Sequence, residues 1–123
     1  MTNNDERLTM EYTNPVYQGY FADPFVWQHE GVYYAIGTGA AEAEGTLNNI
    51  DTPNKSHVFP LLRSFDFANW HFVDHALLLL DPALGNNYWA PEVACSDGQF
   101  YLYYSVGHED KTISCVWLQV IVL

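Results

Sequence analysis

Two carboxylates stand beside a proline and among aromatic residues, a setting in which an acid can do chemistry. Asp23 lies within residues 20–27 (YFADPFVW), and Glu92 lies within residues 88–93 (YWAPEV). Proline fixes its own φ and restricts the residue before it, so we predict an extended backbone at Asp23. An acid on such a stiff backbone suits a site that must place a charge accurately. The alternative is that the Asp-Pro pair only initiates a turn.

The two acids lie in an internal repeat. Placing Gly31 on Gly98 gives an offset of 98 − 31 = 67 residues without a gap. The other matches at this offset are Pro24 with Pro91, Val26 with Val93, Glu30 with Asp97, Tyr33 with Phe100, and Tyr34 with Tyr101. Each copy spans about four short strands, and repeated antiparallel strands of this period indicate the blades of a β-propeller. The segments that hold Asp23 and Glu92 would then take equivalent places at the start of their repeats, so that two acids from successive blades could converge on one pocket.

The strands that must position these acids follow from the pattern of apolar and turn residues. Val32 to Gly37 is predicted as the second strand of a hairpin closed around Glu30-Gly31. We further predict strands at 58–64 and 71–73, a turn at 64–70, and loops at 40–57 and 81–87. Leu77 to Leu80 fits either a strand or buried coil. Packing within and between blades is assigned to Trp27, Trp70 and the pairs Tyr33/Tyr34 and Tyr103/Tyr104.

The composition is acidic and aromatic. The chain of 123 residues carries 15 Asp and Glu against 4 Lys and Arg, a formal net charge of −11. That charge argues against nucleic acid or an anionic membrane as a partner. Aromatic residues make up 16% of the chain, which favours strands over helices and offers sugar rings apolar surfaces to stack on. Because sugar hydroxyls can donate to carboxylates, a neutral carbohydrate fits this composition.

Residues 1–13 have the composition of a polar leader. Met1 to Glu11 contains no apolar stretch typical of a signal peptide, so we predict a cytoplasmic protein. Cys95 and Cys115 lack the spacing of metal ligands and are predicted to be buried thiols. The five histidines show no metal signature either, so no cofactor is assigned.

The repeats do not fill a closed propeller. Residues 14–110 would form two blades, whereas closure needs about four to eight. Residues 111–123 end without a turn or cap at the point where a third strand is due. We interpret this tail as atypical, the result of truncation or of a shifted reading frame.

Three motifs, in order along the chain, resemble glycoside hydrolase family 43. They are Asn14-Pro15-Val16 with Phe21-Ala22-Asp23-Pro24, then Arg63-Ser64 with Asp66 and Asn69-Trp70, then Trp89-Ala90-Pro91-Glu92-Val93 with Asp97-Gly98 and Tyr101. That family contains β-xylosidases, α-L-arabinofuranosidases and arabinanases. The resemblance covers residues 14–110, the first two of the family's five blades.

The resemblance implies an all-β fold, a five-bladed β-propeller of antiparallel blades that is incomplete in this chain. It also implies a glycosidase that hydrolyses xylosides or arabinosides of plant polysaccharides with inversion, with Asp23 as the general base. Trp89 and Glu92 would contact the sugar, while the general acid and an Asp that modulates its pKa come from later blades. Because the general acid would lie outside this chain, we expect no useful hydrolysis by this chain alone. Some relatives hold an ion in the central channel of the intact propeller. The alternative function is a non-catalytic carbohydrate-binding or interaction module on the same blades.

Overall fold

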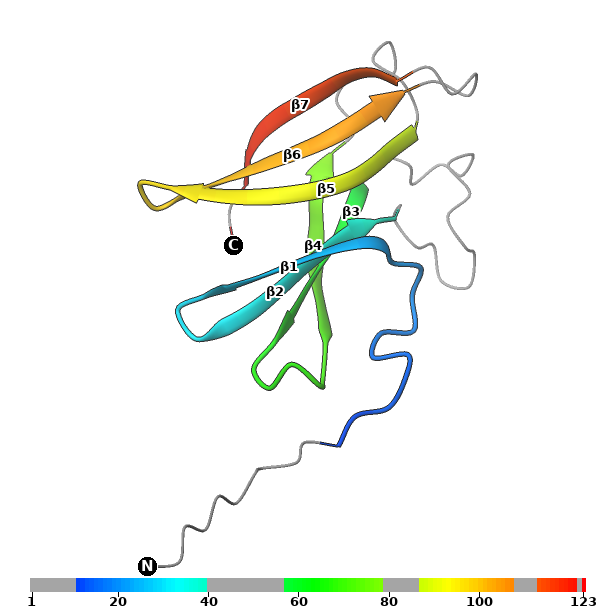
Figure 1. Cartoon of the computed structure of the whole chain (residues 1–123), viewed down its shortest axis with the longest axis vertical. Coiled ribbons are helices and arrows are strands. Elements are labelled where there is room, and N and C mark those ends of the chain that lie inside the picture. The colour runs from blue at the N-terminus through cyan, green and yellow to red at the C-terminus, as the bar shows by residue number, and fades with distance from the viewer. Residues whose placement is uncertain (1–10, 40–56, 79–86, 108–112, 122) are drawn as a thin grey trace, which may run out of the picture.

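Two antiparallel sheets make up the fold (Figure 1). The computed structural model describes residues 11–39, 57–78, 87–107, 113–121 and 123. The first sheet has the strand order β1-β2-β3-β4 and the second the order β5-β6-β7. Their bounds are β1 Ala22–His29, β2 Val32–Thr38, β3 His57–Ser64, β4 His71–Leu78, β5 Asn87–Ser96, β6 Gln99–Gly107 and β7 Ile113–Ile121. The predicted all-β, antiparallel architecture is confirmed. In this part of the chain no helix offers the length and apolarity needed to cross a membrane.

Both sheets contain a tight hairpin at the same place in the repeat. The turn between β1 and β2 has φ of +49° at Glu30 and +79° at Gly31. The turn between β5 and β6 has φ of +50° at Asp97 and +75° at Gly98. Two loop residues with positive φ form the type I′ turn, whose twist matches that of the flanking strands. The predicted hairpin at Glu30-Gly31 is confirmed. Glycine suits the second loop position because it accepts a positive φ without the penalty of a Cβ atom.

Each hairpin also carries a β-bulge near the start of its first strand. The register of β1 against β2 shifts between Ala22 and Phe25, and Asp23 has a φ of +48°. The register of β5 against β6 shifts in the same way, with φ of +49° at Ala90. The prediction of an extended backbone at Asp23 is therefore wrong. A bulge places an extra residue in the strand, and aspartate tolerates the left-handed region better than most residues.

The link between β3 and β4 is a compact turn held by side chains. Asp66 Oδ1 accepts hydrogen bonds from the backbone N–H groups of Ala68 (2.9 Å) and Asn69 (2.8 Å). The Ser64 hydroxyl donates to the same carboxylate at 3.0 Å. These donors, the Asn69 backbone first, hold the pKa of Asp66 well below its ordinary range. The predicted turn at 64–70 is confirmed, and its Asp66 has a structural role.

Other segments extend or correct the predictions. β4 is longer than the predicted strand 71–73 and includes Leu77, whose backbone pairs with Val58. Leu77 therefore belongs to a strand, while residues 79 and 80 and most of the loops at 40–57 and 81–87 lie outside the described residues. Cys95 is exposed rather than buried, since the end of β5 at the hairpin is open to solvent. The side chain of Cys115 also lies outside the described residues.

The tail forms a strand. β7 pairs with β6 along its length, from Ile113 opposite Gly107 to Ile121 opposite Phe100. The expectation that the chain ends without a third strand in this sheet is wrong. The segment ISCVWLQVI contains four β-branched residues and a tryptophan, which favour the extended conformation, and the free edge of β6 supplies the partner.

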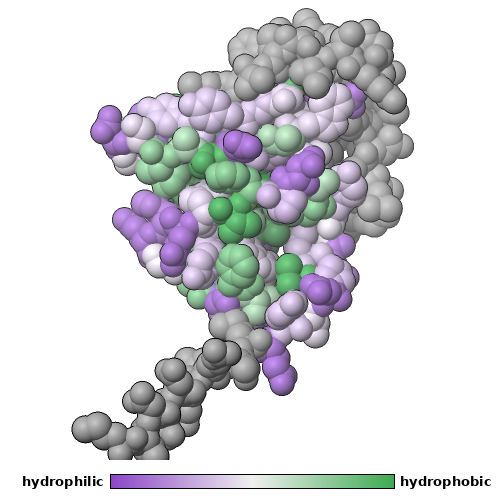
Figure 2. Space-filling view, viewed as in Figure 1, coloured by the Kyte–Doolittle hydropathy of each residue, from purple (hydrophilic) through white to green (hydrophobic). Residues whose placement is uncertain are grey.

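The hydrophobic core lies between the two sheets, where β5 packs against β1 and β2. The fully buried Phe59 ring lies 5.4 Å from the ring of Tyr104 and 6.2 Å from that of Tyr88. Figure 2 shows apolar side chains gathered in the middle of one face, with hydrophilic residues around them. Trp27 stacks on Tyr34 across the β1–β2 pair at 5.5 Å, as the packing assignment predicted. Tyr103, by contrast, is 41% exposed.

Candidate active site

Asp23 lies at the bulge of β1 with its side chain exposed. The hydroxyl of Thr38, the last residue of β2, donates to Asp23 Oδ2 at 3.0 Å. Thr38 itself is only 9% exposed. The carboxylate is therefore anchored on its buried side and remains open to solvent.

The same hydroxyl connects the two sheets. The backbone N–H of Ala90 in β5 donates to Thr38 Oγ1 at 2.9 Å. A hydroxyl has one proton to donate and two lone pairs to accept with, so both bonds can form at once. Asp23 and the Trp89–Glu92 segment are consequently tied to one buried atom.

Two glycines let the chain fold closely around Thr38. A Cβ atom on Gly37 would lie 2.9 Å from the Ala22 carbonyl oxygen and from the ring of Phe21. A Cβ atom on Gly39 would lie 3.0 Å from the ring of Pro60. Side chains at either position would push away the segment that leads into Asp23. The sequence Gly-Thr-Gly therefore has a local reason in the structure, and it was the available signal for Thr38, which the sequence analysis missed.

Trp89 and Glu92 flank the bulge of β5. Trp89 is half-buried, Glu92 is exposed, and Pro91 between them is fully buried. The contact of Ala90 with Thr38 brings this segment next to Asp23. Among the described residues, no hydrogen bond joins Glu92 to Asp23.

The two acids do not occupy equivalent places in the repeat. At an offset of 67 residues, Asp23 matches Ala90 (23 + 67 = 90) and Glu92 matches Phe25 (92 − 67 = 25). The segments that hold the acids do occupy equivalent places, each at the bulge of its strand, but the acid of the second copy lies two residues further along. A backbone amide of the second sheet takes the equivalent place and bonds to the hydroxyl that holds Asp23.

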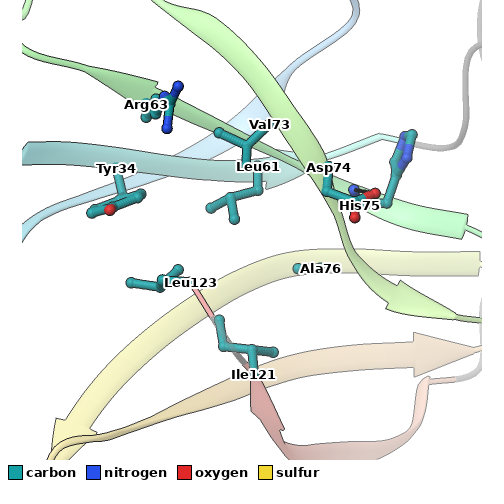
Figure 3. A pocket seen from close by; sticks show the side chains of 9 residues that line it. All are labelled: Tyr34, Leu61, Arg63, Val73, Asp74, His75, Ala76, Ile121 and Leu123. Atoms are coloured by element: carbon teal, nitrogen blue, oxygen red, sulfur yellow. Dashed lines mark hydrogen bonds between the residues drawn. The ribbon is translucent and has the colours of Figure 1, made fainter.

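Among the described residues, two cavities can be outlined away from Asp23, between the outer parts of the sheets. One, of about 270 Å³, is lined by residues of the first sheet, including Tyr34, Arg63 and Asp74, and by Ile121 and Leu123 (Figure 3). The other, of about 360 Å³, lies against His29, Phe100 and the same end of the chain. Asp23, Trp89 and Glu92 line neither cavity. The candidate site is therefore defined by the hydrogen-bonded geometry at Asp23 and Thr38.

Potential metal ligands are spread across the part of the chain that the structure describes. Within the described ranges, no three His, Cys, Asp or Glu side chains come together as a set of metal ligands. No ion is therefore assigned to these residues, and the chemistry of the site is considered through Asp23.

Comparisons with known proteins identify the family of this chain. Residues 12–120 match the family model described as glycosyl hydrolases family 43. The extracellular endo-α-(1→5)-L-arabinanase 1 of Bacillus subtilis (strain 168) is 28% identical over 104 residues, which is 78% of this chain and 28% of that protein.

Solved structures give the same result. A thermostable family-43 glycoside hydrolase is similar with a TM-score of 0.60 and 28% identity, over 89% of this chain and 32% of that one. A β-xylosidase/α-arabinofuranosidase of the family, from a compost microbial metagenome, has a TM-score of 0.64 at 20% identity, over 89% and 34% of the two chains. At that identity the second likeness shows the fold alone.

These findings correct one prediction and establish the family. The expectation of a cytoplasmic protein is contradicted by the arabinanase relative, which is extracellular. That expectation rested only on the lack of an apolar stretch in residues 1–11, and such an absence does not locate a protein whose given chain spans about a third or less of its relatives' lengths. The match over residues 12–120 covers most of the sequence. The chain belongs to glycoside hydrolase family 43.

Proposed function

We propose that this chain supplies the first two sheets of a propeller glycosidase and, in Asp23, its general base. The observation that supports this most is the anchoring of Asp23. One carboxylate oxygen accepts a hydrogen bond from the buried Thr38 hydroxyl, while the side chain stays exposed. A base must hold its position and still reach a water molecule, and this arrangement meets both needs.

The proposed reaction is hydrolysis with inversion. A water molecule attacks the anomeric carbon from the side of Asp23, which takes the proton from that water. A carboxylic acid on the opposite face of the sugar, about 6.5–9.5 Å from the base, protonates the leaving oxygen. We assign that acid to no residue of this chain.

Because no residue of this chain is assigned as the general acid, we can predict how the isolated chain behaves. A positioned proton donor contributes a factor of about 10²–10⁴ to the rate. The 123-residue chain should therefore give no turnover of aryl xylosides or arabinofuranosides above buffer. Turnover that Asp23→Asn abolishes would contradict this expectation.

Trp89 and Glu92 are proposed to contact the sugar. The half-buried indole of Trp89 can stack on the apolar face of a sugar ring, and the exposed carboxylate of Glu92 can accept from its hydroxyls. Both flank Ala90, whose N–H bonds to Thr38, so the proposed sugar-contacting segment and the base share one anchor. Glu92 is not proposed as the general acid.

The proposed substrates are neutral polymers or oligomers that contain pentoses. The arabinanase relative supports arabinosides, and membership of a family that contains β-xylosidases supports xylosides. A net charge of −11 suits an uncharged substrate better than an anionic one. Because the arabinanase relative is extracellular, we propose that this protein also acts outside the cell.

A non-catalytic carbohydrate-binding module is the second candidate. The observation that favours it is that the exposed Glu92 and the half-buried Trp89 lie together on β5, whereas no residue of this chain is assigned as the general acid. Reading the gene past residue 110 in all three frames distinguishes the two. A frame that continues with three further sheets, bearing an Asp and a Glu toward the site, supports the glycosidase. If no frame continues, the binding module is the better account.

A further inference from the structure

We propose that Thr38 is a positioning residue, which fixes the carboxylate of Asp23 to the second sheet through its hydroxyl. The relevance of this inference to catalysis rests on the proposed role of Asp23 as the general base. Its structural content stands on two hydrogen bonds, 3.0 Å to Asp23 Oδ2 and 2.9 Å from the Ala90 N–H. Both meet at the one hydroxyl oxygen of Thr38, a residue that is only 9% exposed.

The direction of these bonds is determined by the donors present. The backbone N–H of Ala90 can only donate, so Thr38 Oγ1 must accept from it. The single proton of the hydroxyl then points to Asp23, and the carboxylate oxygen Oδ2 is the acceptor. The backbone of β5 thus orients the Thr38 hydroxyl, which in turn orients the acid.

The backbone conformations at both ends of this link need support. Asp23 and Ala90 have φ of +48° and +49°, a region that residues other than glycine rarely adopt. Such conformations persist where the surrounding contacts determine them, and they concentrate at functional sites. The Thr38 hydroxyl contacts both residues directly, and it ties the two bulges to each other.

Threonine also suits the space. Gly37 and Gly39 leave room on either side for Tyr20, Phe21 and Pro60 to approach the strand. Valine has nearly the same shape as threonine but offers no hydroxyl, so it removes the hydrogen bonds while filling the same volume. Serine keeps the hydroxyl and loses one methyl group. This pair of substitutions separates hydrogen bonding from packing.

The test compares Thr38→Val with Thr38→Ser in the 123-residue chain by NMR spectroscopy, with Thr13→Val as an exposed control. Two signals are read: the Hα–Hβ couplings of Asp23, which report its side-chain rotamer, and the hydrogen exchange rate of the Ala90 amide. Thr38→Val should average the Asp23 couplings and speed exchange at Ala90 about two- to tenfold, in line with the loss of one hydrogen bond. Thr38→Ser and Thr13→Val should keep the values of the parent chain.

Several outcomes overturn the proposal. If Thr38→Val speeds exchange at Ala90 but leaves the Asp23 couplings unchanged, Thr38 stabilises the sheets without positioning the acid. If Thr38→Ser behaves like Thr38→Val, the methyl group and not the hydroxyl is responsible. Should Thr38→Val fail to fold, Asp23→Ala tests the link from its other end. The hydroxyl proton of Thr38 must then exchange faster with water, because its acceptor is lost, and an unchanged exchange rate of that proton refutes the link. None of these signals requires turnover, so they remain informative even if the proposed glycosidase activity is not found.

Discussion

Replacing Leu102 with alanine should destabilise both sheets, although Leu102 belongs only to the second. Its side chain is 0% exposed and lies in the core cluster together with Ile36 and Phe59 of the first sheet. Removing three carbons costs about 2.4 kcal/mol, at about 0.8 kcal/mol per buried methylene group. The cavity left behind adds to this, so we expect the free energy of unfolding to fall by about 2–5 kcal/mol.

The assay is urea unfolding followed by tryptophan fluorescence, together with amide hydrogen exchange read separately in β2 and β6. If the two sheets share one core, the protection of both strands falls by the same free energy. Val120→Ala is the matched control, because Val120 is 50% exposed on the second sheet and should change stability by no more than about 0.5 kcal/mol. Ile36→Val offers a milder test from the first sheet, at about 0.5–1.5 kcal/mol. Unchanged protection in β2 beside lost protection in β6 would refute the shared core.

Two further predictions concern the turns. The folded state lowers the pKa of Asp66 below its ordinary value of 3.8, so this group stabilises the fold above that pH and the contribution is lost as the pH falls. Urea midpoints measured from about pH 6 down to about pH 2 should therefore drop less steeply in Asp66→Asn than in the parent chain. An equal pH dependence of the midpoint in the two chains would contradict the stabilising role of the Asp66 carboxylate in the turn. Gly31→Ala should cost about 1–2 kcal/mol through its positive φ alone, since nothing lies within 4 Å of the added Cβ. Gly98→Ala, at φ of +75°, should cost the same in urea unfolding, and a neutral result at either position would contradict the type I′ assignment.

The hairpins could be predicted from sequence because their cause is local. An acid followed by glycine between two apolar runs is sufficient to specify a two-residue turn, as Glu30-Gly31 shows. The order of motifs likewise led to the family. Asp23-Pro24, the turn at Asp66 and the Trp89–Glu92 segment are each short runs of neighbouring residues, so each motif can be identified from the sequence alone.

The site could not be predicted in full because its contacts are distant in sequence. The positive φ of Asp23 depends on how β1 pairs with β2, and the neighbouring proline alone suggested the opposite. Thr38 contacts Ala90 across 52 residues, and nothing near Thr38 in sequence names that partner. The strand at β7 was missed because it depends on the free edge of β6, whereas the prediction looked for a turn and a cap.

The most direct measurement of the central claim is the rate of glycoside hydrolysis by a product of this gene that carries the remaining sheets. Asp23→Asn is compared there with Asp74→Asn, which changes an exposed acid on β4. If Asp23 is the general base, kcat on an aryl arabinofuranoside or xyloside should fall by about 10²–10⁴ in Asp23→Asn and stay unchanged in Asp74→Asn. Equal activity of Asp23→Asn and the parent enzyme would contradict the account.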